Sequence, residues 1–474
     1  MTCLGLHSVA ELLTFITSIF VGLTMVMGVN AVNAAPTFML DYFKYIQHSE
    51  DAVPHFENFW VNILTYYSVI TYVAQAANEP LNLTRFVCRF SLQFRMLAAL
   101  MILFVELIVI VVLPHTGASE TGAMVAIIIV AFLGGVARAY YENTGYALFG
   151  PCPSKMMSGT LVGVAVSGFL VSIIQIILKA SMPDTYDSVL TQSIIYFSLS
   201  LGIIFLGGVM LFILKWNPFA RRYISELRSH KNFFENIYSH HIKEVPVHPS
   251  EPTGDALPPA EGLLQLETVG ETEEKVIKST LDSDEEEEVR AIQPGEEPAV
   301  LTTAEMLQSV NVWFIIKQVW DMMLACLLIF TVTYLMNPGV LMAIDYDDKW
   351  FSTVVMAVYN GADLIGRGLS MIKKLWVPRK VVLIVAIARL VFIPLITLCA
   401  AHKIPSHAAA YVFTAALGLT NGFFGTLTMV YAPGTVTLHT EAERAMAGQA
   451  TGVCLLSGCA IGAMIQIALV LPFN

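Results

Sequence analysis

Residues 92–114 read LQFRMLAALMILFVELIVIVVLP, and stretches of this kind decide the fold class. The stretch holds two charged residues, Arg95 near its start and Glu106 near its middle. About 20 consecutive apolar residues allow a helix to cross the hydrocarbon core of a bilayer. Because lipid offers no hydrogen bonds to the backbone, a spanning segment of this length is expected to be an α-helix.

The same pattern recurs along the whole chain. Of its 474 residues, 56% are hydrophobic and 13% are charged, and the mean hydropathy is +0.66. A soluble domain carries about twice that charged fraction. The sequence lacks the short segments of alternating polarity that mark a transmembrane β-barrel. These observations predict an all-α polytopic membrane protein and exclude a soluble globular domain.

We expect eleven transmembrane helices, six before a long polar segment and five after it. The expected spans are residues 11–36, 57–78, 92–114, 122–147, 156–180, 190–215, 311–336, 350–372, 379–401, 406–431 and 446–471. The chain would then divide into a six-helix bundle at 1–215, a polar segment at 216–309 and a five-helix bundle at 310–474. Two bundles that move about a site near the bilayer midplane are typical of transporters.

Most of the net negative charge of the chain comes from an acidic stretch between Glu251 and Glu305, within the polar segment at 216–309. The net charge is −11, and residues 282–288 read DSDEEEE. A segment this polar can bury little apolar surface, so it is expected to be largely disordered. Lysine and arginine near the span ends favour a cytoplasmic N-terminus, which also places this segment in the cytoplasm and the C-terminus outside.

The eighth expected span contains YNGADLIGRG, which places two opposite charges at bilayer depth. Asp363 and Arg367 are four residues apart, so they share one helix face, where they can pair with each other or bind a polar ligand. Charges inside a membrane are costly and usually face a partner or a cavity. A structural ion pair that joins two helices is the alternative interpretation.

Two other spans carry opposite charges with the same spacing. In the fourth span, Glu142 is a candidate proton carrier or ligand acceptor, and neutralisation by Arg138 is the alternative. In the seventh span, Lys317 and Asp321 are expected to form a structural pair, because Lys317 lies near the cytoplasmic end.

Glu106 in the third span has no partner nearby in the sequence. Arg389 in the ninth span could pair with any of the buried acids. Glycines in the eighth span, Gly361, Gly366 and Gly368, permit close approach of a neighbouring helix.

Neutral polar residues add further candidates for a ligand site. Asn30 and Asn33 in the first span suit a ligand with both donors and acceptors, such as a purine edge. Hydrogen bonding between helices is the alternative role for such amides. Weaker pocket candidates are Gln318, Trp320, Asn360 and Asn421.

Several classes of function lack their sequence signature. There is no Walker A sequence, so ATP-driven pumping is not expected. The seven cysteines show no Cys-x-x-Cys spacing, and the histidines form no metal-ligand pattern. We therefore expect neither an enzyme nor a cofactor or metal site, and no binding of nucleic acid.

Several segments together resemble the equilibrative nucleoside transporter family. Residues 360–367 are similar to its signature Asn-x-x-Asp-x-x-Gly-Arg. Residues 22–30 resemble a glycine-led stretch that ends in Pro-Trp-Asn, with Gly28 and Val29 in place of the Pro and Trp. Glu142 stands where the family often has a Gln that contacts the nucleobase, and Arg95 matches an arginine associated with the central site.

The departures at Gly28, Val29 and Glu142 look more like the kinetoplastid protozoan branch of that family. This branch includes carriers of purine nucleosides and purine nucleobases, several of them coupled to protons. The resemblance implies a fold like that of the major facilitator superfamily and a plasma-membrane carrier that works by alternating access. Its partners would be the purine substrate, the lipid bilayer and, with coupling, protons.

The resemblance also assigns roles to the polar residues. Asp363 and Arg367 would bind the ribose hydroxyls, or orient the pocket around a bare base. Asn30 and Glu142 would contact the base, and Arg95 would belong to the central site. Glu142 and Asp363 are the candidates for proton coupling, since both are carboxyl groups at membrane depth.

Two other functions remain open at this point. A membrane receptor or scaffold could recruit partners through the acidic segment, and deletion of residues 250–300 would then remove its output while a carrier would keep its uptake. A carrier of another small polar solute, such as a sugar, is compatible with the same fold, because a fold does not determine its substrate.

Overall fold

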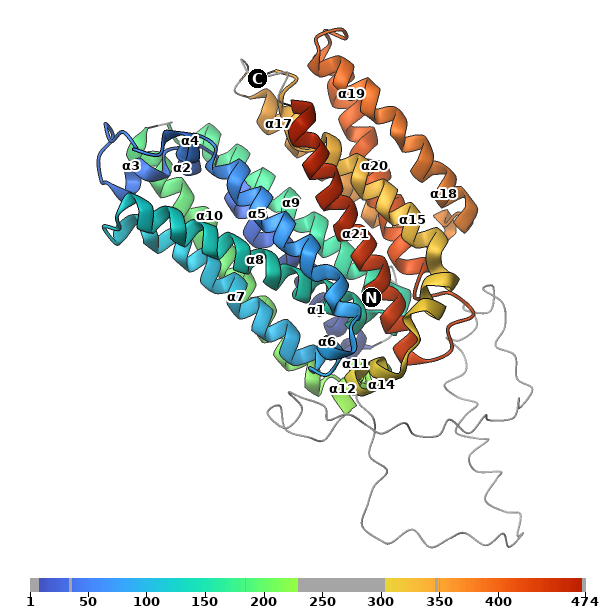
Figure 1. Cartoon of the computed structure of the whole chain (residues 1–474). Coiled ribbons are helices and arrows are strands. Elements are labelled where there is room, and N and C mark those ends of the chain that lie inside the picture. Colours follow the sequence, from blue (N-terminus) through green and yellow to red (C-terminus); the bar gives the residue numbers. More distant parts are fainter. Residues whose placement is uncertain are drawn as a thin grey trace, which may run out of the picture. The chain divides into compact units, whose positions relative to one another are not determined.

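The computed structural model describes residues 8–33, 36–183, 185–228, 303–345, 348 and 350–470, and all regular elements within them are helices (Figure 1). The long helices of the first half are α1 (Val9–Asn33), α5 (Ile63–Asn78), α7 (Leu92–Val112), α8 (Glu120–Phe149), α9 (Ser154–Ser181) and α10 (Tyr186–Ile213). Those of the second half are α15 (Val312–Met336), α17 (Phe351–Ser370), α18 (Arg379–Ala388), α19 (Phe392–Ala400), α20 (His407–Tyr431) and α21 (Glu441–Val470).

Short helical turns connect these long helices. They are α2 (Pro36–Leu40), α3 (Tyr42–Ile46), α4 (Glu57–Val61), η2 (Glu79–Leu83), α6 (Arg85–Cys88), η3 (Leu113–His115), η4 (Leu214–Trp216), α11 (Pro218–Tyr223), α12 (Ser225–Arg228), α14 (Thr303–Ser309), α16 (Gly339–Met342), η7 (Lys373–Leu375) and η8 (Arg389–Val391). The predicted disorder of the polar segment falls on residues 229–302, outside the described residues, while the two ends of that segment form α11, α12 and α14.

Nine helices in the described part of the chain are long and apolar enough to cross a membrane. They coincide with nine of the eleven expected spans. The expected span at 57–78 is interrupted at Asn62, and its longer part, α5, has 16 residues, which extend about 24 Å. The expected span at 350–372 is the helix α17, whose polar residues lower its hydropathy.

Serine and asparagine side chains cap several of the long helices. Ser91 accepts a hydrogen bond from the backbone of Phe94 at the start of α7, and Ser119 does the same for Gly122 in α8. These caps satisfy backbone N–H groups that have no partner within the helix. The ninth expected span is interrupted by the turn η8, which separates α18 from α19, and Pro394 in the first turn of α19 has no N–H to donate to the preceding turn.

Close helix pairs hold each half of the chain together. In the first half α1 packs on α9, and α8 packs on α5 and α7; in the second half α15 packs on α21 and α17 on α20 (Figure 1). The α1–α9 contact depends on Gly22, which faces the carbonyl of Thr160, and the α17–α20 contact on Gly366, which faces that of Leu419. Such small residues let membrane helices approach closely. The two halves meet where α17 packs on α9 and α21 on α8 and α5.

Candidate functional site

Asp363 and Arg367 lie one turn apart on α17 and form an ion pair inside the protein. Arg367 Nε donates a hydrogen bond of 2.8 Å to Asp363 Oδ2, and each residue is 5% exposed. Asn421 of α20 donates from Nδ2 to the other carboxylate oxygen, Oδ1, over 2.7 Å. Both oxygens of this buried carboxylate therefore have a protein donor, which offsets the loss of its hydration.

Arg367 also joins the two halves of the chain. Its Nη1 donates to the backbone carbonyl of Leu161 on α9 over 3.0 Å. Asn360, two turns earlier on α17, donates from Nδ2 to Ser172 Oγ of α9 over 2.8 Å. The family-like stretch at 360–367 thus lies at the contact between the halves, with polar groups directed at α9.

The two asparagines of α1 lie in different surroundings. Asn30 donates from Nδ2 to Ser167 Oγ of α9 over 2.9 Å. Asn33 is exposed at the last residue of α1. Asn30 and the polar residues of α17 therefore contact the same helix, α9. Asn33 lies outside this group of contacts.

The candidates on α15 point away from this polar region. Trp320 is 56% exposed, and Gln318 accepts a hydrogen bond from a threonine hydroxyl in the connection between α20 and α21. Asp321 pairs with Arg379 over 2.6 Å, and in the described part of the chain it forms no ion pair with Lys317. The expected pair of Lys317 and Asp321 is therefore wrong, because a partner from α18 lies closer to the carboxylate.

Glu106 and Arg138 form a buried ion pair in the first half. Arg138 Nη2 lies 3.3 Å from Glu106 Oε1, and the hydroxyl of Tyr67 on α5 donates to the same oxygen. Arg138 has no ion pair with Glu142 in the described residues, although it is near enough to act on it electrostatically, so the alternative interpretation of a neutralising pair at i, i+4 finds no ion pair to support it. Glu106, which has no partner nearby in the sequence, is therefore the acid that pairs with Arg138.

Glu142 lies instead among polar groups at the contact between the halves. It is 4% exposed, and Glu79 of η2 is near enough to interact with it electrostatically. The neighbouring Asn143 donates to Glu79 Oε2 over 3.2 Å and to the backbone carbonyl of Gln449 on α21 over 3.0 Å. The side-chain amide of Gln449 is buried without a hydrogen-bond partner in the described residues. Buried polar groups of this kind usually bind water or a ligand.

The whole chain also matches proteins of known class. The profile of the family described as nucleoside transporter matches residues 124–471. This chain belongs to the nucleoside transporter family. The chain is 34% identical over 492 residues to nucleoside transporter 2 of Leishmania donovani. The alignment covers 99% of this chain and 96% of that protein. The chain is also 31% identical over 470 residues to adenosine transporter 1 of Crithidia fasciculata, and this alignment covers 97% of the chain and 93% of that protein.

A solved structure supports the fold of this nucleoside transporter. The proton:xylose symporter XylE of the major facilitator superfamily superimposes with a TM-score of 0.53 at 11% identity, covering 95% of this chain and 86% of that one. The predicted family and the predicted all-α, major-facilitator-like membrane fold are both confirmed. At this identity, the likeness to XylE shows the fold alone.

Arg95 of the transporter lies apart from the Asp363 pair. It is 5% exposed in the first turn of α7, and the ionisable groups around it are Cys88, Glu226 and Tyr140. All three of its guanidinium nitrogens lack a hydrogen-bond partner within the described residues. The structure therefore places this predicted site residue at the end of α7 that also contacts α12.

Glu226 of α12 connects that end of α7 to α14. Its carboxylate accepts hydrogen bonds from the backbone N–H of Leu92 over 3.1 Å and of Ala304 over 3.4 Å. Burial raises the pKa of Glu226 to about 7, although these hydrogen bonds favour the charged form. The junction therefore holds a carboxyl group whose charge is opposed by burial and favoured by its hydrogen bonds.

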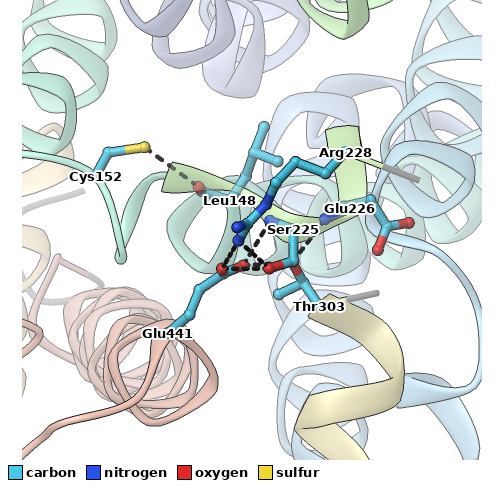
Figure 2. A network of polar contacts seen from close by, with 7 residues as sticks. All are labelled: Leu148, Cys152, Ser225, Glu226, Arg228, Thr303 and Glu441. Atoms are coloured by element: carbon cyan, nitrogen blue, oxygen red, sulfur yellow. Dashed lines mark hydrogen bonds and ion pairs between the residues drawn. The ribbon is translucent and has the colours of Figure 1, made fainter. Parts of the chain in front are cut away.

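Glu441, the first residue of α21, ties the same junction to the second half (Figure 2). Its Oε1 accepts hydrogen bonds from the backbone N–H of Ser225 over 2.8 Å and from the Thr303 hydroxyl over 2.7 Å. Its Oε2 lies 3.0 Å from Arg228 Nη2. The carboxylate thus holds α12 and α14, the described ends of the polar segment, against the start of α21.

Sequence reasoning missed Glu79, Glu441 and Thr333, the last of which donates to Asn421. Glu79 and Glu441 stand at the ends of hydrophobic stretches, where acids are usually solvated. A threonine inside a span usually bonds its own helix, so its sequence gives no signal for a contact with another helix.

Proposed function

We propose that this transporter carries purine nucleosides, or purine nucleobases, across the plasma membrane by alternating access. The observation that carries the proposal is the position of the Asp363–Arg367 pair, which the family-like stretch of α17 holds against α9 at the contact between the halves. The name of the Crithidia relative, adenosine transporter 1, supports a purine substrate.

The contacts of Arg367 suggest how a substrate would bind to Asp363 and Arg367. Its Nη1 is bonded to a backbone carbonyl of the other half, Leu161 O. If the halves separate, that donor loses its partner and becomes available to a ribose hydroxyl or a base oxygen. Asp363 would accept a hydrogen bond from a second hydroxyl. Asn30 and Glu142, both buried or half-buried beside the contact, would bind the base.

The junction around Glu441 fits the same cycle. It joins α12 and α14 to α21 on the side predicted to be cytoplasmic. A carrier that releases substrate on that side would have to break these contacts. Arg95 lies beside Glu226 in this junction. We therefore propose that Arg95 belongs to the contacts that open on the cytoplasmic side, and not to the substrate pocket.

Substrate competition tests the proposal. We expect saturable uptake of labelled adenosine or inosine in cells that lack their own nucleoside transporters, with competition by the other purine nucleoside or by hypoxanthine and weak competition by uridine. The physical reason is that a pocket with paired donors and acceptors discriminates by hydrogen bonds, each worth about 0.5–1.5 kcal/mol. Uptake that no purine reduces would rule the proposal out.

Glu142 is the better of the two candidates for proton coupling. Asp363 has a guanidinium bonded to one oxygen and an amide to the other, so a proton would have to displace one of them. Glu142 has no ion pair within the described residues, since Arg138 bonds Glu106. A buried carboxyl group without a bonded cation can take up a proton without breaking an ion pair.

Replacing Glu142 by Gln is expected to remove the pH dependence of uptake. The amide keeps the shape and hydrogen-bonding capacity of a protonated carboxyl but cannot release a proton. Uptake would be measured over external pH values from about 5.5 to 8, together with substrate-induced current under voltage clamp. Glu57→Gln, at an exposed residue of α4, should leave both unchanged. A wild-type carrier without current or pH dependence would instead be facilitative.

A further inference from the structure

Arg389 is a buried cation that the substrate site does not contact directly. It is 1% exposed and lies where α18 gives way to η8. Its Nη2 donates to Thr333 Oγ1 of α15 over 2.6 Å. Its Nε and Nη1 have no hydrogen-bond partner within the described residues, so Thr333 is the group that ties this guanidinium to the rest of the bundle.

Thr333 continues a chain of hydrogen bonds toward the ion pair of α17. Its hydroxyl lies 2.8 Å from Asn421 Oδ1 on α20, and Asn421 Nδ2 lies 2.7 Å from Asp363 Oδ1. Thr333 and Asn421 are 0% and 2% exposed, so water does not compete for these bonds. The chain crosses four helical segments, η8, α15, α20 and α17, and ends on the carboxylate proposed to bind substrate.

The direction of each hydrogen bond in this chain follows from Arg389. A guanidinium can only donate, so the Thr333 oxygen must accept from it and offer its single hydrogen elsewhere. The acceptors within reach are Asn421 Oδ1 and the carbonyl of Ile329, 2.9 Å away on the same helix. When the hydroxyl donates to Asn421 Oδ1, the amide is fixed with its NH₂ group toward Asp363. The opposite amide orientation would place an oxygen against the carboxylate.

We propose that Thr333 is a positioning residue for substrate binding, which orients the Asn421 amide and thereby holds Asp363 in its binding geometry. Thr333 itself does not touch substrate. The inference rests on the proposed role of Asp363. It adds that the affinity for substrate depends partly on Thr333, a residue outside the binding pocket. Hydrogen bonds of a buried chain strengthen one another, so loss of one member is expected to weaken the rest.

Thr333→Val tests the inference because valine has nearly the same shape without the hydroxyl. We expect the KM for purine nucleoside uptake to rise about tenfold, the size of one hydrogen bond in a charged network. Thr333→Ser keeps the hydroxyl and should stay within about twofold of wild type. Thr331→Val is the matched control, since Thr331 donates to the carbonyl of Leu327 on its own helix, and its KM should not change.

A double-variant cycle separates positioning from general damage. In the background Asn421→Ala, Thr333→Val should cause no further rise in KM, because the residue it acts through is gone. A full additional effect in that background would overturn the inference, as would a normal KM for Thr333→Val at normal surface level. Wild-type protein without saturable purine uptake would refute the proposed function instead.

Thr333→Val leaves Arg389 buried without its partner and could fail to fold. The double variant Thr333→Val/Arg389→Leu removes both polar partners, which proteins tolerate far better than the loss of one. Its KM should still be raised, because Asn421 lacks a donor at Oδ1. A wild-type KM for this folded double variant would contradict the inference.

Discussion

Replacing Asp363 by Asn is expected to reduce purine uptake by a factor of about a hundred or more. Arg367 is 5% exposed and would keep its charge without a carboxylate. Removing one partner of a buried ion pair costs about 3–5 kcal/mol, and each 1.4 kcal/mol corresponds to a factor of ten. The Asn421 amide would also lose its charged acceptor at 2.7 Å.

The effect would be measured as initial uptake rate, corrected for carrier at the cell surface. Asp41→Asn is the control: Asp41 pairs with Lys44 over 2.8 Å, but their side chains are 34% and 38% exposed. Exposed pairs contribute about 0–1 kcal/mol, so this variant should keep nearly normal uptake. Near-normal uptake by Asp363→Asn at normal surface level would remove the pair from the substrate site.

Arg367→Lys is also expected to reduce the initial rate of purine uptake strongly in the same assay. The guanidinium uses Nε for Asp363 and Nη1 for the Leu161 carbonyl, so its planar fork spans two helices. A lysine ammonium is a single point donor and does not reproduce that geometry.

The sequence predicted the parts of this transporter that depend on local pattern. Hydropathy placed the long helices, because crossing a bilayer needs a continuous apolar stretch. The pair of Asp363 and Arg367 was also within reach, since four residues along a helix bring two side chains to the same face. The interrupted helix at Asn62 was not predicted, because its flanking residues are apolar on both sides.

Contacts between different helices were beyond the sequence. The sequence offered Glu142 as a possible partner of Arg138, but Arg138 bonds Glu106, which lies on α7. Periodicity shows which side chains share a face of one helix, but not which helix that face meets. Glu441 and Ser225 illustrate the limit most clearly, because their positions differ by 216 in the chain and yet the two residues share a hydrogen bond.

Gly366→Ala is expected to destabilise the fold clearly, and Gly368→Ala, two residues along α17, to have almost no effect. A methyl group on Gly366 would meet the carbonyl of Leu419 and lie 2.8 Å from the backbone nitrogen of Phe423, both on α20. Backbone atoms of a packed helix cannot move aside singly, so the two helices would have to separate. A methyl group on Gly368 would find no atom within 4 Å.

The contact at Gly366 is also the contact that positions the ion pair. On the facing helix, a methyl group on Gly422 would meet the carbonyl of Asp363 and lie 2.9 Å from the backbone nitrogen of Arg367. Overpacking a tight contact costs about 1–3 kcal/mol or more, and here it would also pull Asn421 away from the carboxylate.

Thermal stability in detergent, followed by size-exclusion chromatography, distinguishes the two glycines. Gly366→Ala should lower the Tm by several degrees or leave no monodisperse protein, and Gly368→Ala should match wild type within about a degree. Equal stability of the two variants would contradict the packing of α17 on α20. All three glycines of this helix predicted a close approach from the sequence, yet Gly361 would have only an ordinary contact of 3.4 Å with Phe169. Only Gly366 of the three faces another helix backbone closely enough to require the absence of a side chain.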